Sequence, residues 1–426
     1  MTLGLGGIAE VFADRNFRWY SIGSIISWQS FFVQAVAVSW TAWDLTHSTA
    51  WLAIVALADA TANIVLMPIG GVLADRGDRL SMLFISYACE TIQAAILAAL
   101  AFSGALTIDA LTALAAFHGA AHAFSIPVSY GLLPRFVEPR RLSSAIAVAA
   151  AYSQLGLFVG PALAGWIIVR FGAPAAFASN VFGYLTYFGC VAALRTPAGY
   201  RQARTAPKNI ARDIVDGLAA IWAHRGIKVI LMLLLFGDGL YGAVRQMAPA
   251  FADKALSVGV GGLSTLLASA GVGATIAALW LAHGGVKRAA PTTILWGFLG
   301  FVSAVTGLML SRRLGEGAVA MAVLGACFEV CRTGALALLQ VSVPDAMRGR
   351  IMSSLFLLTR LPGAIAVAAI GAASAEWGLR APLLCGAALA LLAWGGAYCV
   401  RGRTEAAFAP RRVFAVEGEG RSYAPR

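Results

Sequence analysis

Long runs of apolar residues, separated by short polar turns, recur along almost the whole of this 426-residue sequence. A helix needs roughly 20 apolar residues to cross about 30 Å of hydrocarbon, and the runs have about this length. With 59% hydrophobic and only 12% charged residues, the chain is far more apolar than soluble domains are. We therefore predict an all-α membrane protein that crosses the bilayer many times and leaves little sequence for a soluble domain.

The apolar runs predict twelve transmembrane helices in two groups of six. The first six are expected at residues 17–43, 49–73, 80–103, 107–133, 142–169 and 173–194, and six more begin near residues 225, 258, 291, 317, 351 and 379. A polar, basic segment separates the groups. The predicted parts are an N-terminal bundle (1–195), a cytoplasmic linker (196–224), a C-terminal bundle (225–401) and a disordered cytoplasmic tail (402–426).

The positive charges predict how the chain crosses the membrane. Only five of the 32 Lys and Arg residues fall on predicted outer loops, three lie inside spans, and the other 24 lie on segments expected in the cytoplasm. Both termini are therefore predicted to be cytoplasmic, in a multi-pass protein of the inner or plasma membrane. This topology explains the net charge of +12 without a nucleic-acid partner. We expect a monomer whose partners are the lipid bilayer and a small-molecule substrate.

The two halves carry a weak internal repeat at an offset of 206 residues. The matched pairs are Leu132 and Leu338, Leu133 and Leu339, Val137 and Val343, Gly165 and Gly371, Phe171 and Trp377, and Gly172 and Gly378. Duplicated six-helix bundles are a common way for carriers to build a central site between two pseudo-symmetric halves. The repeat predicts that architecture.

The loop after the second predicted helix contains Gly71, Asp75, Arg76 and Arg79 in the order Gly-x-x-x-Asp-Arg-x-x-Arg. A glycine lets helices approach closely, an aspartate can face the positive N-terminus of a neighbouring helix, and arginines hold the loop on the cytoplasmic side. These residues are predicted to form a conformational gate at the inner mouth. A generic basic cytoplasmic turn is the alternative.

This loop resembles the signature loop of the major facilitator superfamily, although Asp78 and Leu80 stand where a glycine and a basic residue are usual. The form of the loop is similar to that of the macrolide and enterobactin exporter branch. Further segments resemble the same branch: 16–18 (Asn-Phe-Arg), 44–48 (Asp-Leu-Thr-x-Ser), 339–345 and 348–350. The resemblance covers nearly the whole chain and implies a drug:proton antiporter with the twelve-span major facilitator fold.

Four residues of the fifth predicted helix, Gly156, Gly160, Pro161 and Gly165, resemble the antiporter motif of exporters, with Ala164 where a second glycine is usual. Small residues four apart permit close helix crossing, and a proline bends the helix. We expect this helix to pack tightly against one from the other half. The resemblance implies export, whereas ordinary membrane-helix packing would use the same residues.

Seven ionisable residues lie inside predicted spans, where each costs about 2.5 kcal/mol or more unless it is paired or hydrated. They are Asp59, Glu90, Asp238, Glu329, Arg245, Arg332 and Arg360. The four acids are candidates for proton coupling, because a carboxylate without a partner can carry a proton across the membrane. Asp59 is the first candidate, since no base lies near it on its own helix. The spacing of Glu329 and Arg332 predicts a local ion pair, and buried pairs that only lock helices are the alternative.

The remaining polar side chains inside spans are expected to line a substrate cavity. They are Gln29, Gln34, His118 and His122, together with the three arginines. Two imidazoles one turn apart can relay protons, but hydrogen bonds to backbone or water are the more common role of such histidines. With no third ligand close in sequence, and six cysteines within apolar runs, neither a metal site nor a disulfide is predicted.

Together these features predict a secondary active transporter: a proton-coupled exporter of a small amphiphilic or anionic molecule, such as a drug or siderophore, that works by alternating access. It needs no cofactor beyond the proton gradient. An importer or facilitator, or a lipid flippase, would be possible on the same fold. An enzyme or primary pump is not indicated, because the sequence has no Walker loop and no histidine followed five places later by aspartate.

Overall fold

The computed structural model describes residues 12–76, 78–132, 142–194, 218–219, 221–222, 224–284, 290–342 and 345–408. Within these residues, ten helices are long and apolar enough to cross a membrane. One of them contains two spans, because its helix is broken at Gly172 (φ 82°). A further helix, Ile108–Leu132, has a similar length and is also mainly apolar. The described chain therefore contains the twelve predicted spans.

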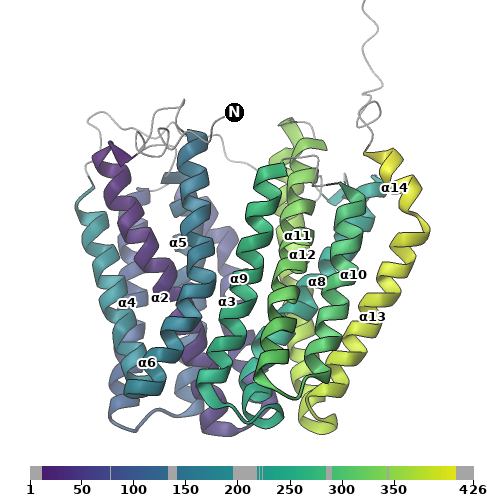
Figure 1. The fold of residues 1–426 in the computed structure, drawn as a ribbon. Coiled ribbons are helices and arrows are strands. Elements are labelled where there is room, and N and C mark those ends of the chain that lie inside the picture. The colour runs from purple at the N-terminus through teal and green to yellow at the C-terminus, as the bar shows by residue number, and fades with distance from the viewer. Residues whose placement is uncertain are drawn as a thin grey trace, which may run out of the picture.

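The helices form two bundles that stand side by side (Figure 1). The N-terminal bundle contains α2 (Arg15–Thr46), α3 (Thr49–Arg76), α4 (Arg79–Phe102), α5 (Ile108–Leu132) and the two spans of α6 (Leu142–Ala192). The C-terminal bundle contains α8 (Arg225–Ala250), the short π-helix η3 (Phe251–Ala255), α9 (Gly259–Gly284), α10 (Pro291–Leu310), α11 (Leu314–Ser342), α12 (Asp345–Trp377) and α13 (Arg380–Cys399). A short helix, α14 (Arg401–Ala407), follows, so the prediction of a disordered tail from residue 402 is wrong for its first residues.

Polar residues at helix ends decide where the helices begin, and several helices extend beyond the apolar runs that predicted them. The Asp14 carboxylate accepts a hydrogen bond from the backbone N–H of Phe17 (2.9 Å), which moves the start of α2 to Arg15. Asp78 caps α4, and hydrogen bonds from the Ser81 hydroxyl (2.6 Å) and from backbone N–H groups hold the pKa of Asp78 below its ordinary value. This cap is therefore lost only when the pH falls through that lowered pKa.

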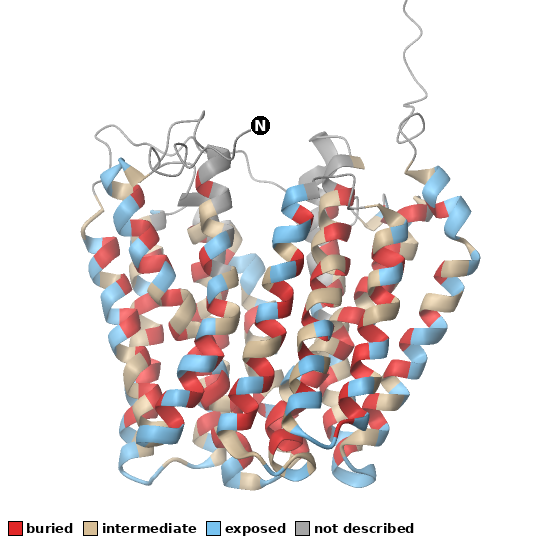
Figure 2. Cartoon of the chain, in the orientation of Figure 1, coloured by how far each residue is buried: buried red, intermediate tan, exposed pale blue. Residues whose placement is uncertain are grey.

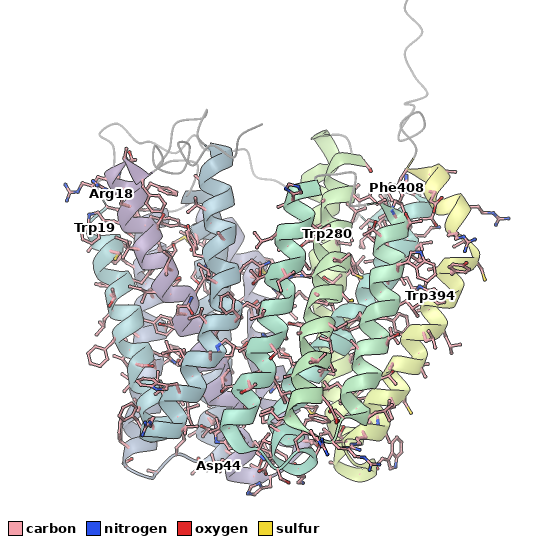
Figure 3. All side chains as sticks on the ribbon, in the orientation of Figure 1. Arg18, Trp19, Asp44, Trp280, Trp394 and Phe408 are labelled. Carbon is pink, nitrogen blue, oxygen red and sulfur yellow. The ribbon has the colours of Figure 1, made fainter. Side chains whose placement is uncertain are left out.

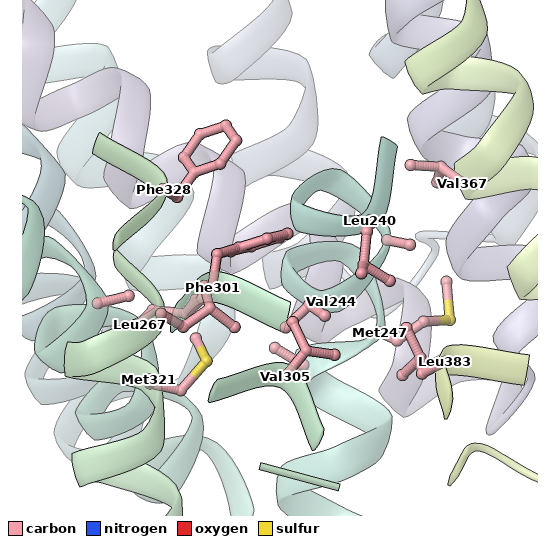
Figure 4. Close-up of a cluster of buried hydrophobic side chains, with 14 of the residues drawn as sticks. Leu240, Val244, Met247, Leu267, Phe301, Val305, Met321, Phe328, Val367 and Leu383 are labelled. Atoms are coloured by element: carbon pink, nitrogen blue, oxygen red, sulfur yellow. The ribbon is translucent and has the colours of Figure 1, made fainter. Parts of the chain in front are cut away.

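The outward faces of both bundles are apolar. Buried residues lie along the inner sides of the helices and exposed residues along the outer sides (Figure 2). Among the most exposed large side chains are Phe182, Trp377 and Leu392, each more than 70% accessible. Apolar groups in such positions suit lipid, which agrees with a membrane protein. Inside the C-terminal bundle, Leu240, Val244, Phe301, Met321 and Phe328 belong to one packed cluster (Figure 4).

The most extensive contacts between the bundles are made by two helix pairs, α6 with α9 and α3 with α12. A Cβ atom on Gly165 would lie 2.0 Å from Ser264 Oγ in α9, and one on Gly371 would lie 2.4 Å from Ala53 Cβ in α3. Gly165 and Gly371 are a matched pair of the 206-residue repeat, so the two contacts between bundles are repeats of one contact. The two halves thus approach each other closely at positions that are related by the predicted pseudo-symmetry.

The beginning of α2 and α14 lie at the same end of the molecule (Figure 1), which we name the inner end. Arg18 marks this end and Asp44 the opposite, outer end (Figure 3). Hydrogen bonds at the outer end join the bundles: the Trp43 indole donates to Asp253 Oδ2 (3.0 Å) and Lys254 Nζ to the backbone O of His47 (3.2 Å). The Lys254 ammonium also lies 4.8 Å from the Trp43 ring centroid. These contacts tie the two bundles together at the outer end.

The orientation in the membrane can be tested with reporters. We expect a reporter fused after Arg403 to report the cytoplasm and one inserted next to Arg313 to report the outside, because Lys and Arg are retained on the cytoplasmic side. Activities of a phosphatase and a fluorescent protein at the two positions provide the measurement. The reverse pattern at both positions would contradict the predicted topology.

Candidate functional site

The first part of the site lies inside the N-terminal bundle, where an acid on α3 meets a histidine on α5. His118 Nδ1 lies 2.8 Å from Asp59 Oδ1. The His118 side chain is 10% exposed and that of Asp59 is 42% exposed, so the carboxylate remains accessible on one side. The prediction that Asp59 lacks a basic partner is therefore wrong. It considered only bases on the same helix and the three arginines, whereas the partner comes from a helix that packs alongside.

A second acid–imidazole contact lies beside the first. His122 Nδ1 is 3.4 Å from Glu90 Oε1, and the Ser125 hydroxyl donates to the same carboxylate oxygen (3.2 Å). The Glu90 side chain is only 2% exposed. The expectation that both histidines bond backbone or water is thus wrong as well, since each contacts a carboxylate. The predicted role of Glu90 did not include Ser125, although its place one turn after His122 on α5 is visible in the sequence.

The two contacts form one cluster, because their rings stack. The imidazoles of His118 and His122 lie 5.6 Å apart at an interplanar angle of 12°, and the Phe31 ring stacks on His122 at 5.0 Å. We name Asp59, His118, His122, Glu90 and Ser125 the acid–imidazole cluster. The stack therefore joins α2 to α5. These side chains are close enough for a charge on one of them to act on the others.

Glycine allows this cluster to form. A Cβ atom on Gly119 would lie 2.0 Å from the backbone O of Asp59, so only glycine permits α5 to approach α3 this closely. One turn along α3, the Asn63 amide donates to the backbone O of Gly119 (3.2 Å). The backbones of α3 and α5 are thereby held together at the level where Asp59 and His118 meet.

The second part of the site lies in the C-terminal bundle. Arg332 Nε on α11 is 4.0 Å from Asp238 Oδ1 on α8. Arg360 on α12 is attracted by Asp238 and repelled by Arg332 and Arg245, so the three arginines lie within electrostatic range of one another. Among the described residues, Arg245 and Arg360 form no ion pair. We name Arg245, Arg332 and Arg360 the arginine cluster.

Glu329 contacts the other bundle. The spacing had predicted a contact with Arg332 instead. Gln154 Nε2 on α6 donates to Glu329 Oε1 (3.2 Å), and the Thr333 hydroxyl donates to the same oxygen. The predicted ion pair with Arg332 is therefore wrong, because Arg332 reaches Asp238. Gln154 was not predicted, since no sequence feature marks a contact between bundles.

A pocket of about 580 Å³ lies between the bundles. Helices of both halves contribute to its wall, which is mainly apolar. The side chains that line it are Phe32, Ala35, Val36, Ser39, Leu157, Pro161, Tyr241, Val244, Arg245, Gln246, Leu267, Ala270 and Met321. Arg245 and Pro161 are the predicted residues among them. A mainly apolar wall with a few polar groups suits a small-molecule site.

Two predicted cavity residues have other positions. Gln34 is buried in a chain of amides: it donates to Gln93 Oε1 (3.0 Å) and accepts from Asn180 Nδ2 (3.3 Å), which ties α2 to α4 and α6. Its role as a cavity residue is therefore not supported. For Gln29, the Oε1 atom is buried and has no hydrogen-bond partner within the described ranges. This amide can still bond a solute or water.

The predicted gate lies at the inner end of α3 and the start of α4. The side chains of Asp75, Arg76 and Arg79 lie outside the described residues, so their gating role stays a prediction. Gly71 is not the residue at the close contact: a Cβ there would meet nothing within 4 Å, whereas one on Gly70 would lie 2.6 Å from the backbone O of Ala123. The expected close approach is thus made by the preceding glycine, against α5.

The glycines of the antiporter-like motif face two different helices. A Cβ on Gly156 would lie 3.0 Å from the Phe32 ring, and one on Gly160 would lie 2.4 Å from Phe32 Cβ, both on α2 of the same bundle. Gly165 faces α9 of the other bundle, and Pro161 lines the pocket. The predicted packing against the other half is therefore correct for Gly165 and wrong for Gly156 and Gly160.

Comparisons with known proteins bear on this geometry. A major facilitator family model described as "Transmembrane secretion effector" matches residues 8–412. The staphyloferrin A transporter of Staphylococcus aureus (strain NCTC 8325 / PS 47) is 22% identical over 168 residues, which are 39% of this chain and 42% of that transporter. The match thus spans less than half the length of that relative.

Solved structures of transporters share the fold. The nucleoside transporter NupG has a TM-score of 0.72 at 11% identity, over 93% of this chain and 100% of the other. A bacterial homologue of the human lysosomal transporter Spinster, solved in an inward-facing and unoccupied conformation, also has a TM-score of 0.72, at 13% identity, over 92% of this chain and 98% of the other. At such identities these structures show the fold alone.

Proposed function

Because this chain belongs to the transmembrane secretion effector family of the major facilitator superfamily, we propose that it is a proton-coupled exporter of a small amphiphilic or anionic molecule. It is a membrane transporter and not an enzyme. The resemblance to macrolide and enterobactin exporters supports the outward direction. The distant relative named as a staphyloferrin A transporter supports a siderophore as one class of cargo, and a drug is the other. We propose that it acts as a monomer in the inner or plasma membrane.

One observation carries this proposal: the two bundles hold ionisable groups of different chemistry, and one of these groups, Arg245, lines the pocket between the bundles. The N-terminal bundle holds carboxylates paired with imidazoles, two kinds of group that take part in proton relays. The C-terminal bundle holds arginines, which remain charged and can bind a solute. Ionisable groups inside a membrane domain are costly, and a transport pathway is their usual role.

In the proposed cycle the two bundles rock about the pocket. The contacts of Trp43 and Lys254 close the outer end, so the described conformation is one from which solute would enter from the cytoplasm. For export, these contacts break while Asp75, Arg76 and Arg79 close the inner mouth. Gly165 and Gly371 lie where the bundles touch and are positioned to serve as pivots.

Proton and solute bind to different bundles in this scheme, which matters for coupling. A proton adds positive charge, so in a shared pocket it would strengthen the binding of an anion and oppose exchange. With the proton on the acid–imidazole cluster and the solute near the arginine cluster, the two compete through the conformation that each one favours. Separate locations are therefore a requirement of proton-driven export of an anion.

The function can be tested in proteoliposomes with an imposed pH gradient and a pH-sensitive dye inside. We expect one of two probes, staphyloferrin A or a macrolide, to move against its concentration gradient while protons move the opposite way. The proton flux should require both the solute and the protein. Empty liposomes and liposomes containing denatured protein are the controls.

Each rival function gives a different result in the same vesicles. An importer would move proton and solute in the same direction, and a facilitator would only dissipate a solute gradient. A flippase would transfer a fluorescent lipid between leaflets and show no solute-dependent proton flux. Any of these results would overturn the proposed export.

A further inference from the structure

The arginine cluster is the least compensated set of charges in the described part of the membrane domain. Its three arginines face two nearby carboxylates, Asp238 and Glu329, so at least one positive charge is left over. Asp59 also attracts Arg360, but its carboxylate already lies 2.8 Å from His118. Uncompensated arginines in a membrane span are unfavourable unless water or an anion accompanies them.

One arginine of the cluster, Arg245, lies in the wall of the pocket. Asp238, Tyr241 and Arg245 are spaced three and four residues apart, so they share one face of α8, and Tyr241 and Arg245 line the pocket itself. The Arg332 side chain is 42% exposed, and Arg360 is also exposed. α12 packs closely on α8, because a Cβ on Gly239 would lie 2.9 Å from Ala366 Cβ. Arg360 lies six residues before Ala366 on α12, within electrostatic range of Asp238.

The arginines also repel one another. Arg360 is repelled by both Arg332 and Arg245, and this repulsion is stronger in a protein interior than in water. An anion placed among them would remove the repulsion and form charge-assisted hydrogen bonds, and guanidinium groups bind carboxylate or phosphate in a bidentate manner. The site is therefore arranged for an anion before any solute arrives.

The rest of the pocket suits an apolar group. Phe32, Val36 and Leu157 line it from the N-terminal bundle, and Leu267 and Met321 from the C-terminal bundle. The Tyr241 ring is stacked on Phe328 at 4.0 Å, which fixes an aromatic surface beside Arg245. A solute that fills this pocket presents a charged group at one end and an apolar group at the other.

Building on the proposed function, we propose that the solute is an amphiphilic organic anion whose carboxylate or phosphate group binds between Arg245 and Arg360 while its apolar part lies on the wall formed by both bundles. Arg332 stays next to Asp238 and holds the Asp238 carboxylate in place. Arg245 and Arg360 are thus the residues that select the charge of the solute.

Equilibrium binding to the purified protein in detergent tests this proposal with three matched probes. Phthalate carries two carboxylates on an aromatic ring, benzoate carries one, and 1,2-xylylenediamine carries two positive charges on a similar ring. At fixed ionic strength we expect phthalate to raise the melting temperature most, benzoate less, and the diamine not at all. Loss of one charged hydrogen-bonding partner should weaken phthalate binding roughly tenfold in Arg245→Gln and in Arg360→Gln.

Two further variants separate charge recognition from folding. Arg313→Gln removes an arginine exposed at the outer end and should bind phthalate as the parent does. Arg245→Lys keeps the charge but loses the bidentate fork, so its affinity should fall between those of the parent and Arg245→Gln. If Arg360→Gln does not fold, the Arg245 series decides alone. Equal stabilisation by the diamine, or parent-like phthalate binding by Arg245→Gln, would overturn the proposal.

The outcome is independent of the transport direction. Binding in detergent needs neither a gradient nor movement of solute, so an importer of anions would pass this test and fail the export test. An exporter of cations would concentrate its solute in vesicles but show no phthalate binding. Failure of the inference and failure of the proposed function are therefore distinguishable.

Discussion

Replacing Asp59 with asparagine is expected to abolish transport driven by a pH gradient while solute binding persists. Asparagine keeps the size of the side chain and a carbonyl oxygen next to His118, but it cannot accept a proton at neutral pH. The Asp59→Asn protein should therefore behave as if residue 59 were permanently protonated. In proteoliposomes with an imposed gradient, accumulation should fall to the level of empty vesicles, whereas exchange of labelled for unlabelled solute without a gradient should continue.

Two variants make this result specific. Asp109→Asn removes an exposed acid at the start of α5 and should transport as the parent does. His118→Gln leaves the Asp59 carboxylate without its imidazole partner and should impair transport driven by the pH gradient, because the contact between the two groups is lost. If Asp59→Asn still concentrates solute as the parent does, Asp59 is structural, and the same assay should be applied to Glu90, Asp238 and Glu329.

Replacing Gly119 with valine should prevent the N-terminal bundle from assembling. A Cβ at this position would lie 2.0 Å from the backbone O of Asp59, and neither backbone can move without separating α3 from α5. Overpacking of this kind costs about 3 kcal/mol or more, which is a large share of the stability of a domain. We expect Gly119→Val to lower both the yield of monodisperse protein in detergent and its melting temperature.

Gly189→Val provides the matched control for this prediction. Gly189 lies on α6, is exposed on the outside of the same bundle, and a Cβ there would meet nothing within 4 Å. This variant should be as stable as the parent, since valine is compatible with a lipid-facing helix. Equal stability of both variants, measured by fluorescence-detected size exclusion over a temperature series, would show that the α3–α5 contact is looser than described.

The spans and their grouping could be predicted from the sequence because apolar length and charge asymmetry are properties of single segments. α10, for example, begins at Pro291 as predicted. The start of α12 was placed near residue 351, whereas the helix begins at Asp345, because its first turns are polar and continue beyond the apolar run. Helix ends are decided by capping and hydrogen bonding, which hydropathy does not detect.

The partners of the buried charges could not be predicted, and the reason is geometric. Successive residues of a helix point in directions about 100° apart, so the face that meets a neighbour depends on the rotation of each helix in the bundle. Hydropathy does not fix this rotation when most faces are apolar. For the same reason the close glycine was assigned to Gly71 and is Gly70, and the partner of Glu329 is Gln154 and not Arg332.

The contacts of α5 have a consequence for how the N-terminal bundle can move. His118 and His122 contact acids on α3 and α4, and Gly119 lies against the backbone of α3. Three helices are thereby tied together inside one bundle, so we expect α3, α4 and α5 to move as one rigid unit when the bundles rock.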